Sequence, residues 1–111
     1  MEISFIEDKV GNLNDFKACE KQWGSQVAKL IARRLNEVRA VLTLSELLRP
    51  GFPGKWHALK GDRKGQFASN LKGPYRLICV PDGDPEKYME SDNINAHKVV
   101  AVIVVEIGDY H

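Results

Sequence analysis

Residues 99–107 read Val-Val-Ala-Val-Ile-Val-Val-Glu-Ile and form the most apolar run in the chain. Most of these residues are β-branched, and β-branched side chains favour strands over helices. The run therefore predicts a central strand of a sheet. It is only nine residues long, whereas a membrane-spanning helix needs ~20 apolar residues. We therefore expect no membrane association from this segment.

Working back from this run, the preceding residues alternate between apolar and polar with a period of two, which is typical of strands. The alternation predicts strands at residues 56–59, 66–71 and 75–80, joined by turns at 61–65 and 72–74. Residues 81–98 are polar, acidic and rich in Asp, Pro and Asn, and they predict a long loop. A further short strand is expected at the N-terminus, around Ile3 and Phe5.

Between the first strand and the others, the period becomes helical. Apolar residues recur at three- and four-residue spacing from Val27 to Leu42, which predicts an amphipathic helix over residues 25–41. A shorter helix is expected over residues 12–23, and Gly24 should end it before Ser25 caps the next. The order predicts an α+β fold: an N-terminal strand and a two-helix hairpin packed on a mostly antiparallel sheet of four to five strands.

Composition bounds the possible functions. The chain has 111 residues, 43% of them hydrophobic and 28% charged, as expected for one globular domain spanning residues 1–111. The net charge of +1 hides an asymmetry: residues 1–20 sum to −3, residues 21–79 to +9 and residues 80–111 to −5. A strongly basic middle segment in a nearly neutral protein predicts an anionic partner, of which nucleic acid is the most obvious.

Several site classes lack their sequence signatures. The two cysteines, Cys19 and Cys79, are far apart and fit neither a disulfide framework nor a zinc site, so a reducing cytoplasm is expected. The three histidines have no metal-ligand spacing, and no phosphate-binding glycine loop or nucleophile elbow occurs. The acidic N-terminus does not resemble a secretory signal. We therefore expect neither a metal nor another cofactor.

Two clusters carry residue types suited to acid–base chemistry on a phosphate. The first joins His57, Lys60, Arg63 and Lys64 to Arg76, which we expect on a neighbouring strand. The second is Asp109-Tyr110-His111, held close to the sheet by the strand before it. Such residues fit RNA cleavage by the 2′-hydroxyl of the substrate, in which a base, an acid and cations suffice without a metal. The chemistry alone leaves other functions open.

Other prominent residues have simpler interpretations. Trp56, Phe67, Tyr75 and Leu77 are expected in the core, and both cysteines as buried small apolar residues. Lys29, Arg33 and Arg34 are expected on a solvated helix face.

Three segments together resemble a known family: WHALKGDRKGQF at residues 56–67, GPYRLI at 73–78 and EIGDYH at 106–111. They are similar to HigB-type toxins of the RelE/ParE superfamily, which belong to bacterial type II toxin–antitoxin modules. The resemblance implies a ribosome-dependent mRNA endonuclease that cuts codons in the ribosomal A site. It also implies neutralisation by a HigA-like helix-turn-helix antitoxin, with operator DNA bound only through the toxin–antitoxin complex.

The resemblance also implies residue roles. The expected catalytic or substrate-placing residues are His57, Lys60, Arg76, Asp109, Tyr110 and His111. The proton carrier is left open between His57 and His111, with Asp109 as the orienting group or an alternative base. The expected RNA- or ribosome-binding residues are Lys55, Arg63, Lys64 and Lys72. Two alternatives remain: a non-enzymatic gyrase inhibitor of the ParE branch, and a toxin-like binding module that has lost activity.

Overall fold

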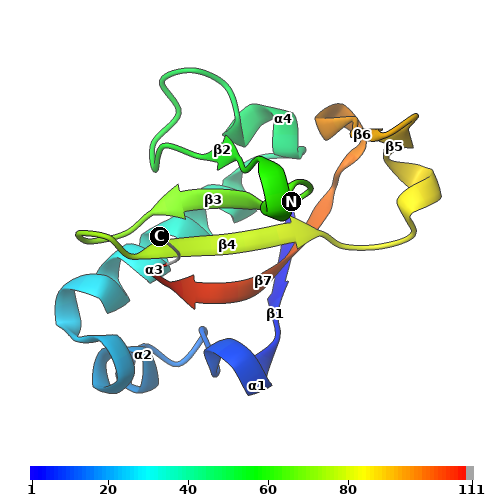
Figure 1. Ribbon diagram of the computed structural model, residues 1–111. Coiled ribbons are helices and arrows are strands. Elements are labelled where there is room, and N and C mark those ends of the chain that lie inside the picture. The colour runs from blue at the N-terminus through cyan, green and yellow to red at the C-terminus, as the bar shows by residue number, and fades with distance from the viewer. Residues whose placement is uncertain (110–111) are drawn as a thin grey trace.

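In the computed structural model, which describes residues 1–109, five strands form one sheet in the order β1-β7-β4-β3-β2 (Figure 1). β1 and β7 are parallel, and the other neighbours are antiparallel. The strands are β1 (Glu2–Phe5), β2 (His57–Ala58), β3 (Phe67–Asn70), β4 (Arg76–Pro81) and β7 (Ala101–Gly108). The α+β fold with a mostly antiparallel sheet is thus confirmed, and the apolar run at residues 99–107 supplies β7, an interior strand.

The helices are α1 (Glu7–Val10), α2 (Phe16–Trp23), α3 (Ser25–Ala40) and α4 (Leu44–Leu47). Figure 1 looks onto the open face of the sheet, with α3 running behind the strands. α2 packs on α3 as the expected hairpin. The core lies between the sheet and this helical layer, where Ile31, Val38, Leu77 and Val104 are fully buried.

The expected start of the first helix was wrong. Residues 12–23 were expected to be helical, but α2 begins at Phe16 because the Asp15 carboxylate accepts a hydrogen bond from the Ala18 amide (3.1 Å). Asn12 instead accepts a bond from the Asn14 amide (3.0 Å) and forms a separate turn. Ser25 does not cap α3, which begins directly after Gly24. The four-residue helix α1 was not predicted.

The segment expected as a long loop at residues 81–98 is structured. β4 extends to Pro81, and the strands β5 (Met89–Glu90) and β6 (Asn93–Ile94) form a small hairpin. Two 3-10 turns flank this hairpin, η2 (Pro85–Lys87) and η3 (Ala96–Lys98). Side chains close these turns: Asp84 caps η2, and Asn95 caps η3. The prediction failed because these elements are too short to show a period.

The Glu90 carboxylate joins the hairpin to η3. It accepts hydrogen bonds from Asn95 Nδ2 and from Lys98 Nζ, both at 2.9 Å. The hydrogen bond from Asn95, followed by the bond and the charge of Lys98, lowers the pKa of Glu90 from its ordinary value. Ile94 and Ala96 pack against the main core from this segment. The hairpin is therefore anchored to the domain.

Both cysteines are buried as free thiols, as the sequence predicted. Trp56, Phe67 and Leu77 are also buried as expected. Tyr75 is not: it lies in the turn before β4 and is 40% exposed. Burial raises the pKa of the Cys79 thiol to about 12, so this group is protonated at neutral pH.

Candidate active site

The open face of the sheet carries His57 in register with three other strands. His57 pairs with Ala68, Ala68 with Ile78, and Ile78 with Glu106. Paired residues point to the same face of a sheet. The adjacent residues Phe67, Cys79 and Val104 face the core, so this row lies on the opposite face. His57 and Glu106 are its ends, three strand spacings or ~14 Å apart.

The next row on this face contains Arg76. It pairs with Asn70 on β3 and with Gly108 on β7. The Arg76 guanidinium donates to the carbonyls of Gly73 (3.1 Å) and Tyr75 (2.9 Å). Gly108 has no side chain, and among residues 1–109, apart from its chain neighbours, no atom lies within 4 Å of the position that a Cβ would take there. Asp109, which is exposed, follows directly.

His57 is held in one orientation by its own turn. The Nδ1 atom lies 2.8 Å from the Lys55 carbonyl, which can only accept a hydrogen bond. Nδ1 therefore carries the proton of the neutral ring, and Nε2 is left with its lone pair. Lys55 adopts a positive φ of 52°, an uncommon conformation for a residue other than glycine. The ring is exposed and borders a surface hollow of about 720 Å³, lined by residues 48–57.

Arg63 covers part of the open face. It belongs to the 3-10 turn η1 (Gly61–Arg63), and its guanidinium makes two contacts with the Glu106 carboxylate, at 3.0 and 3.2 Å. A third bond goes to Gln66 Oε1 (3.0 Å). Arg63 was expected to grip RNA. In the free protein the structure pairs it with an acid of the same face.

The expected cluster of Lys60, Lys64 and Arg76 does not form. Lys60 follows Leu59, whose amide bonds to Gln66 at the beginning of β3, whereas Arg76 pairs with Asn70 at the other end of that strand. Lys60 and Lys64 instead line a pocket with the β5–β6 hairpin. The predicted cluster was wrong because β3 lies between β2 and β4, so Arg76 is not on the strand next to His57.

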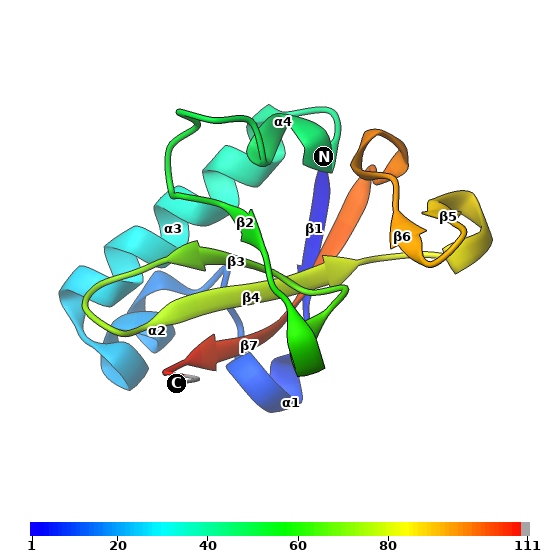
Figure 2. The same ribbon diagram turned by 45° about the horizontal axis from the view of Figure 1, so that its top comes forward.

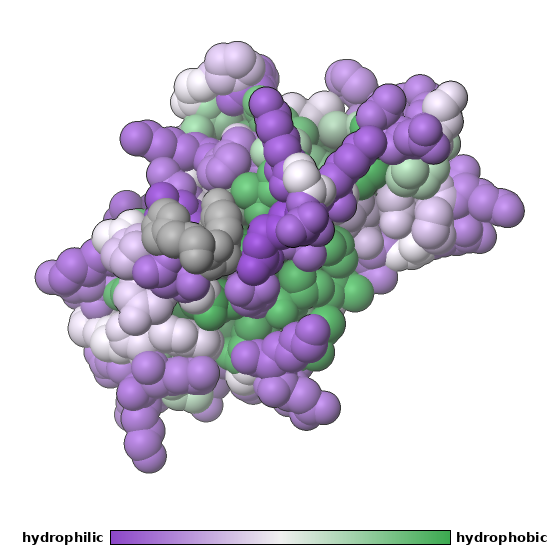
Figure 3. Space-filling view, viewed as in Figure 1, coloured by the Kyte–Doolittle hydropathy of each residue, from purple (hydrophilic) through white to green (hydrophobic). Residues whose placement is uncertain are grey.

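The remaining expected site residues divide by position. Lys55 lines the hollow beside His57, and Lys72 is exposed in the turn between β3 and β4. Tyr110 and His111 lie outside the described residues. Figure 3, seen from the same side as Figure 1, shows hydrophilic side chains gathered over the upper part of this face beside a hydrophobic area. The open face therefore carries His57 and Arg76, and Asp109 follows Gly108, the residue that pairs with Arg76.

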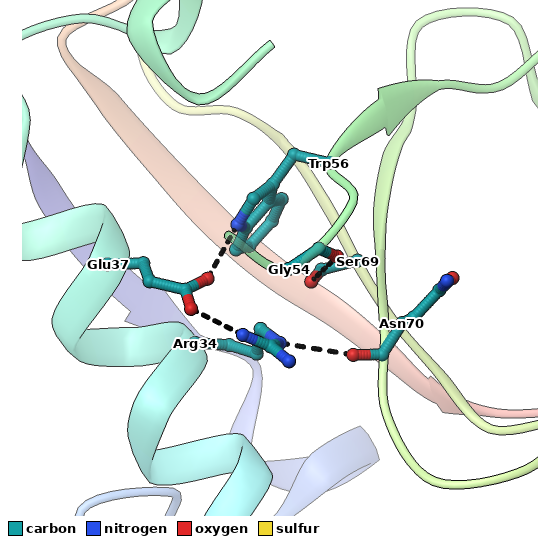
Figure 4. A network of polar contacts seen from close by, with 6 residues as sticks. All are labelled: Arg34, Glu37, Gly54, Trp56, Ser69 and Asn70. Carbon is teal, nitrogen blue, oxygen red and sulfur yellow. Dashed lines mark hydrogen bonds and ion pairs between the residues drawn. The ribbon is translucent and has the colours of Figure 1, made fainter. Parts of the chain in front are cut away.

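A buried polar network behind the sheet was not predicted (Figure 4). Glu37 on α3 forms an ion pair with Arg34, and its other oxygen accepts a bond from the Trp56 indole (2.9 Å). Arg34 Nε donates to the Asn70 carbonyl (3.1 Å). Arg34, expected on a solvated face, is only 8% exposed. The sequence did contain a signal for this burial. Position 34 lies three residues after Ile31 and four before Val38, so it falls within the same apolar stripe.

The network fixes the chain just before His57. The Gly54 carbonyl accepts bonds from Ser69 Oγ (2.7 Å) and from the Asn70 amide (3.1 Å). Gly54 has a φ of +95°, and a Cβ there would lie 2.5 Å from Glu37 Oε1 and 2.9 Å from Ser69 Oγ. Only glycine fits this position. Through Gly54 and Trp56, α3 and β3 together set the path of the chain into β2.

Two other features bear on function. Within residues 1–109, no group of three or more His, Cys, Asp or Glu side chains is arranged to hold a metal ion. None of the helices in this same part of the chain has the length and apolar character needed to cross a membrane.

The fold resembles that of solved toxins. The YoeB dimer from Staphylococcus aureus aligns with a TM-score of 0.57 and 19% identity, over 100% of this chain and 97% of that one. A heterotetrameric YoeB-YefM toxin-antitoxin complex from the same organism gives 0.57 and 17% over the same shares. A YoeB/ParE toxin from Agrobacterium tumefaciens gives 0.55 and 13%, with both chains fully covered. No protein-family profile matches the sequence, and no curated protein does.

Proposed function

We propose that this chain is the toxin of a toxin–antitoxin module and cleaves messenger RNA on the translating ribosome. The observation that carries the proposal is the joint position of His57 and Arg76 on the open face of a sheet with the YoeB/ParE-type fold. They are two strands and two residues apart, a Cα separation of ~12 Å. The His57 imidazole and the longer Arg76 side chain can both reach one sugar-phosphate unit that lies between them.

The proposed reaction uses the 2′-hydroxyl of the RNA. His57 Nε2 accepts the 2′ proton, and the 2′ oxygen forms a bond to the adjacent phosphorus. The bond from phosphorus to the 5′ oxygen of the next nucleotide breaks, and that oxygen takes a proton from an acid. The products are a 2′,3′-cyclic phosphate and a 5′-hydroxyl. Arg76 offsets the charge that grows on the phosphorane oxygens.

We propose that the proton donor is one of residues 109–111, which come after β7 in the sequence; the last residue of β7, Gly108, pairs with Arg76. Asp109 is the orienting group or an alternative base, and the roles of Tyr110 and His111 stay predictions from the sequence. The exposed bases Lys55 and Lys72 would bind ribosomal or messenger RNA, since cations that neutralise phosphates supply most sequence-independent affinity.

The partner we propose is an antitoxin. Two solved Staphylococcus aureus structures contain YoeB together with YefM. The sequence resemblance favours a HigA-like helix-turn-helix protein as the antitoxin here, with operator DNA bound through the complex. A protein that acts on translating ribosomes works in the cytoplasm. Rescue of growth by a co-expressed neighbouring gene, and co-purification of its product, would test the pairing.

Primer extension on a defined message, with and without translating ribosomes, tests the activity. We expect cuts only with ribosomes, and their loss in His57→Ala and Arg76→Ala. His97→Ala and Arg33→Ala are matched controls, because both residues are exposed away from the open face. Cuts that survive Arg76→Ala would refute its role. Without any cuts, gyrase inhibition would be tested next by a supercoiling assay.

A further inference from the structure

We propose that a second pocket, between the basic segment 58–65 and the β5–β6 hairpin, binds one unpaired nucleotide of the RNA. The proposal rests on the proposed function, because it assigns a nucleotide subsite next to the candidate active site. The pocket has a volume of about 570 Å³, within the range of small-molecule sites. Figure 2 shows the hairpin standing beside the turn that follows β2.

The floor of the pocket is apolar. Phe67 and Ile94 contribute from the sheet and from the hairpin, and Leu48 and Leu59 complete it. Phe67 is 4% exposed and belongs to the main core, so the floor is rigid. A Cβ added to Gly65 would lie 4.0 Å from Ile94 Cδ1, so the basic segment and the hairpin lie against each other at this point. An apolar lining of this kind can cover the face of a base.

The rim supplies charge for a phosphate. Lys60 and Lys64 both line the pocket and are exposed, and within residues 1–109 neither has an ion-pair partner. An ammonium group without a partner binds a phosphate readily. Lys60 is three residues beyond His57 along one extended segment, or ~10 Å. Because Phe67 faces the core and His57 the open face, an RNA strand cleaved at His57 would pass around the edge strand β2 to bring a neighbouring nucleotide to this rim.

The hairpin wall supplies acceptors for a base edge. Asp92 and Asn93 line the pocket at the turn between β5 and β6. A carboxylate accepts two parallel hydrogen bonds, and guanine is the base that presents two adjacent N–H donors on its pairing edge. Uracil presents one. We therefore expect Asp92 to favour guanine, with the phosphate held by Lys60 and Lys64.

Titration of the full chain with 5′-GMP and 5′-UMP, followed by amide chemical shifts, tests the site directly. We expect saturable shifts confined to Leu48 and to residues 58–67 and 89–96, and a lower Kd for GMP. The Lys60→Ala/Lys64→Ala variant should raise the Kd at least about tenfold. Lys29→Ala is the control, because it removes an exposed lysine of α3 outside the pocket, and it should change the Kd less than about twofold. Asp92→Asn should bring the two nucleotides to equal affinity.

His57→Ala separates this proposal from the proposed function. It should abolish cleavage and leave the GMP affinity unchanged, because His57 does not line this pocket. If the wild-type chain binds GMP but never cuts RNA, the proposed function fails and the pocket stands. Absence of saturable binding, shifts outside Leu48 and these two segments, an equal loss in Lys29→Ala or an unchanged preference in Asp92→Asn would overturn the pocket assignment.

Discussion

Arg63 and Glu106 meet in a two-point ion pair across the open face, with Nη1 3.0 Å from Oε1 and Nη2 3.2 Å from Oε2. The pair places an acid on the face proposed to bind RNA, and it occupies a guanidinium that would otherwise contact phosphate. The Arg63 and Glu106 side chains are 30% and 42% exposed. Solvent therefore screens the pair, and its contribution to stability is small.

We expect Glu106→Gln to raise RNA affinity a few-fold while lowering the free energy of unfolding by less than about 1 kcal/mol. The reason is that the change removes a negative charge from the open face and with it the ion pair of Arg63 to Glu106. Fluorescence anisotropy with a labelled single-stranded RNA measures the affinity, and urea melts measure the stability. Glu20→Gln makes the same charge change on exposed α2 and should leave affinity nearly unchanged. Equal effects of both variants would contradict a role for the pair.

Glu37→Gln should destabilise the fold strongly. The change leaves the Arg34 guanidinium buried without its acid, and breaking a buried ion pair by removing one partner costs about 3 kcal/mol. Chemical denaturation compares this variant with wild type, and Glu20→Gln again supplies the control. A loss below about 1 kcal/mol would show that solvent reaches the network and that it does not anchor the segment before His57.

Gly54→Ala tests the crowded turn in the same network. The new methyl group would meet Glu37 Oε1, Ser69 Oγ and Trp56 Nε1, and the positive φ adds strain. We expect a loss of about 3 kcal/mol. Gly51→Ala is the matched control in the same loop: its φ is +86°, but no atom lies within 4 Å of the new Cβ. It should cost only about 1 kcal/mol, and equal losses would refute the packing argument.

The elements predicted well from sequence are those long enough to show a period. The stripe from Val27 to Leu42 predicted α3 to within a residue, and the β-branched run predicted β7 in the sheet interior. The strand order could not be predicted, because a period of two identifies a strand without indicating which other strands pair with it. That is why β3 was not expected between β2 and Arg76, and why Lys60 was grouped with the wrong residues.

The polar interior was missed for a different reason. Arg34 was assigned to solvent by its charge although its position lies in the apolar stripe, and its partners Glu37 and Asn70 come from different elements. Side-chain partnership across elements leaves no local pattern. The same holds for the contacts of Glu90 with Asn95 and Lys98, which hold in place a segment whose sequence predicts a loop.

Acidification should loosen the β5–β6 hairpin before the domain unfolds. Because Asn95 and Lys98 lower the pKa of Glu90, their contacts are fully formed above its ordinary value of 4.5 and are lost as the pH falls through the lowered native pKa. The protection factors of the Ile94 and Asn95 amides, which compare their exchange rates with those of an unstructured chain at the same pH, should fall between pH 6 and pH 3. Glu90→Gln should flatten this dependence, whereas Glu86→Gln in η2 should preserve it. A pH dependence that survives in Glu90→Gln would refute the mechanism.

Alkaline conditions should destabilise the core through Cys79. Its pKa is about 12 in the folded chain against an ordinary value of 9.0, so the unfolded state loses this proton first as the pH rises. Stability from this group is therefore intact below pH 9 and falls between pH 9 and 12, by up to about 1.4 kcal/mol for each pH unit. Cys79→Ala creates a small cavity and should be less stable at pH 8. In urea melts at pH 8, 9 and 10, the difference in the free energy of unfolding between the variant and wild type should shrink, because only wild type carries the Cys79 thiol. Parallel losses in both proteins would assign the alkaline sensitivity to other groups.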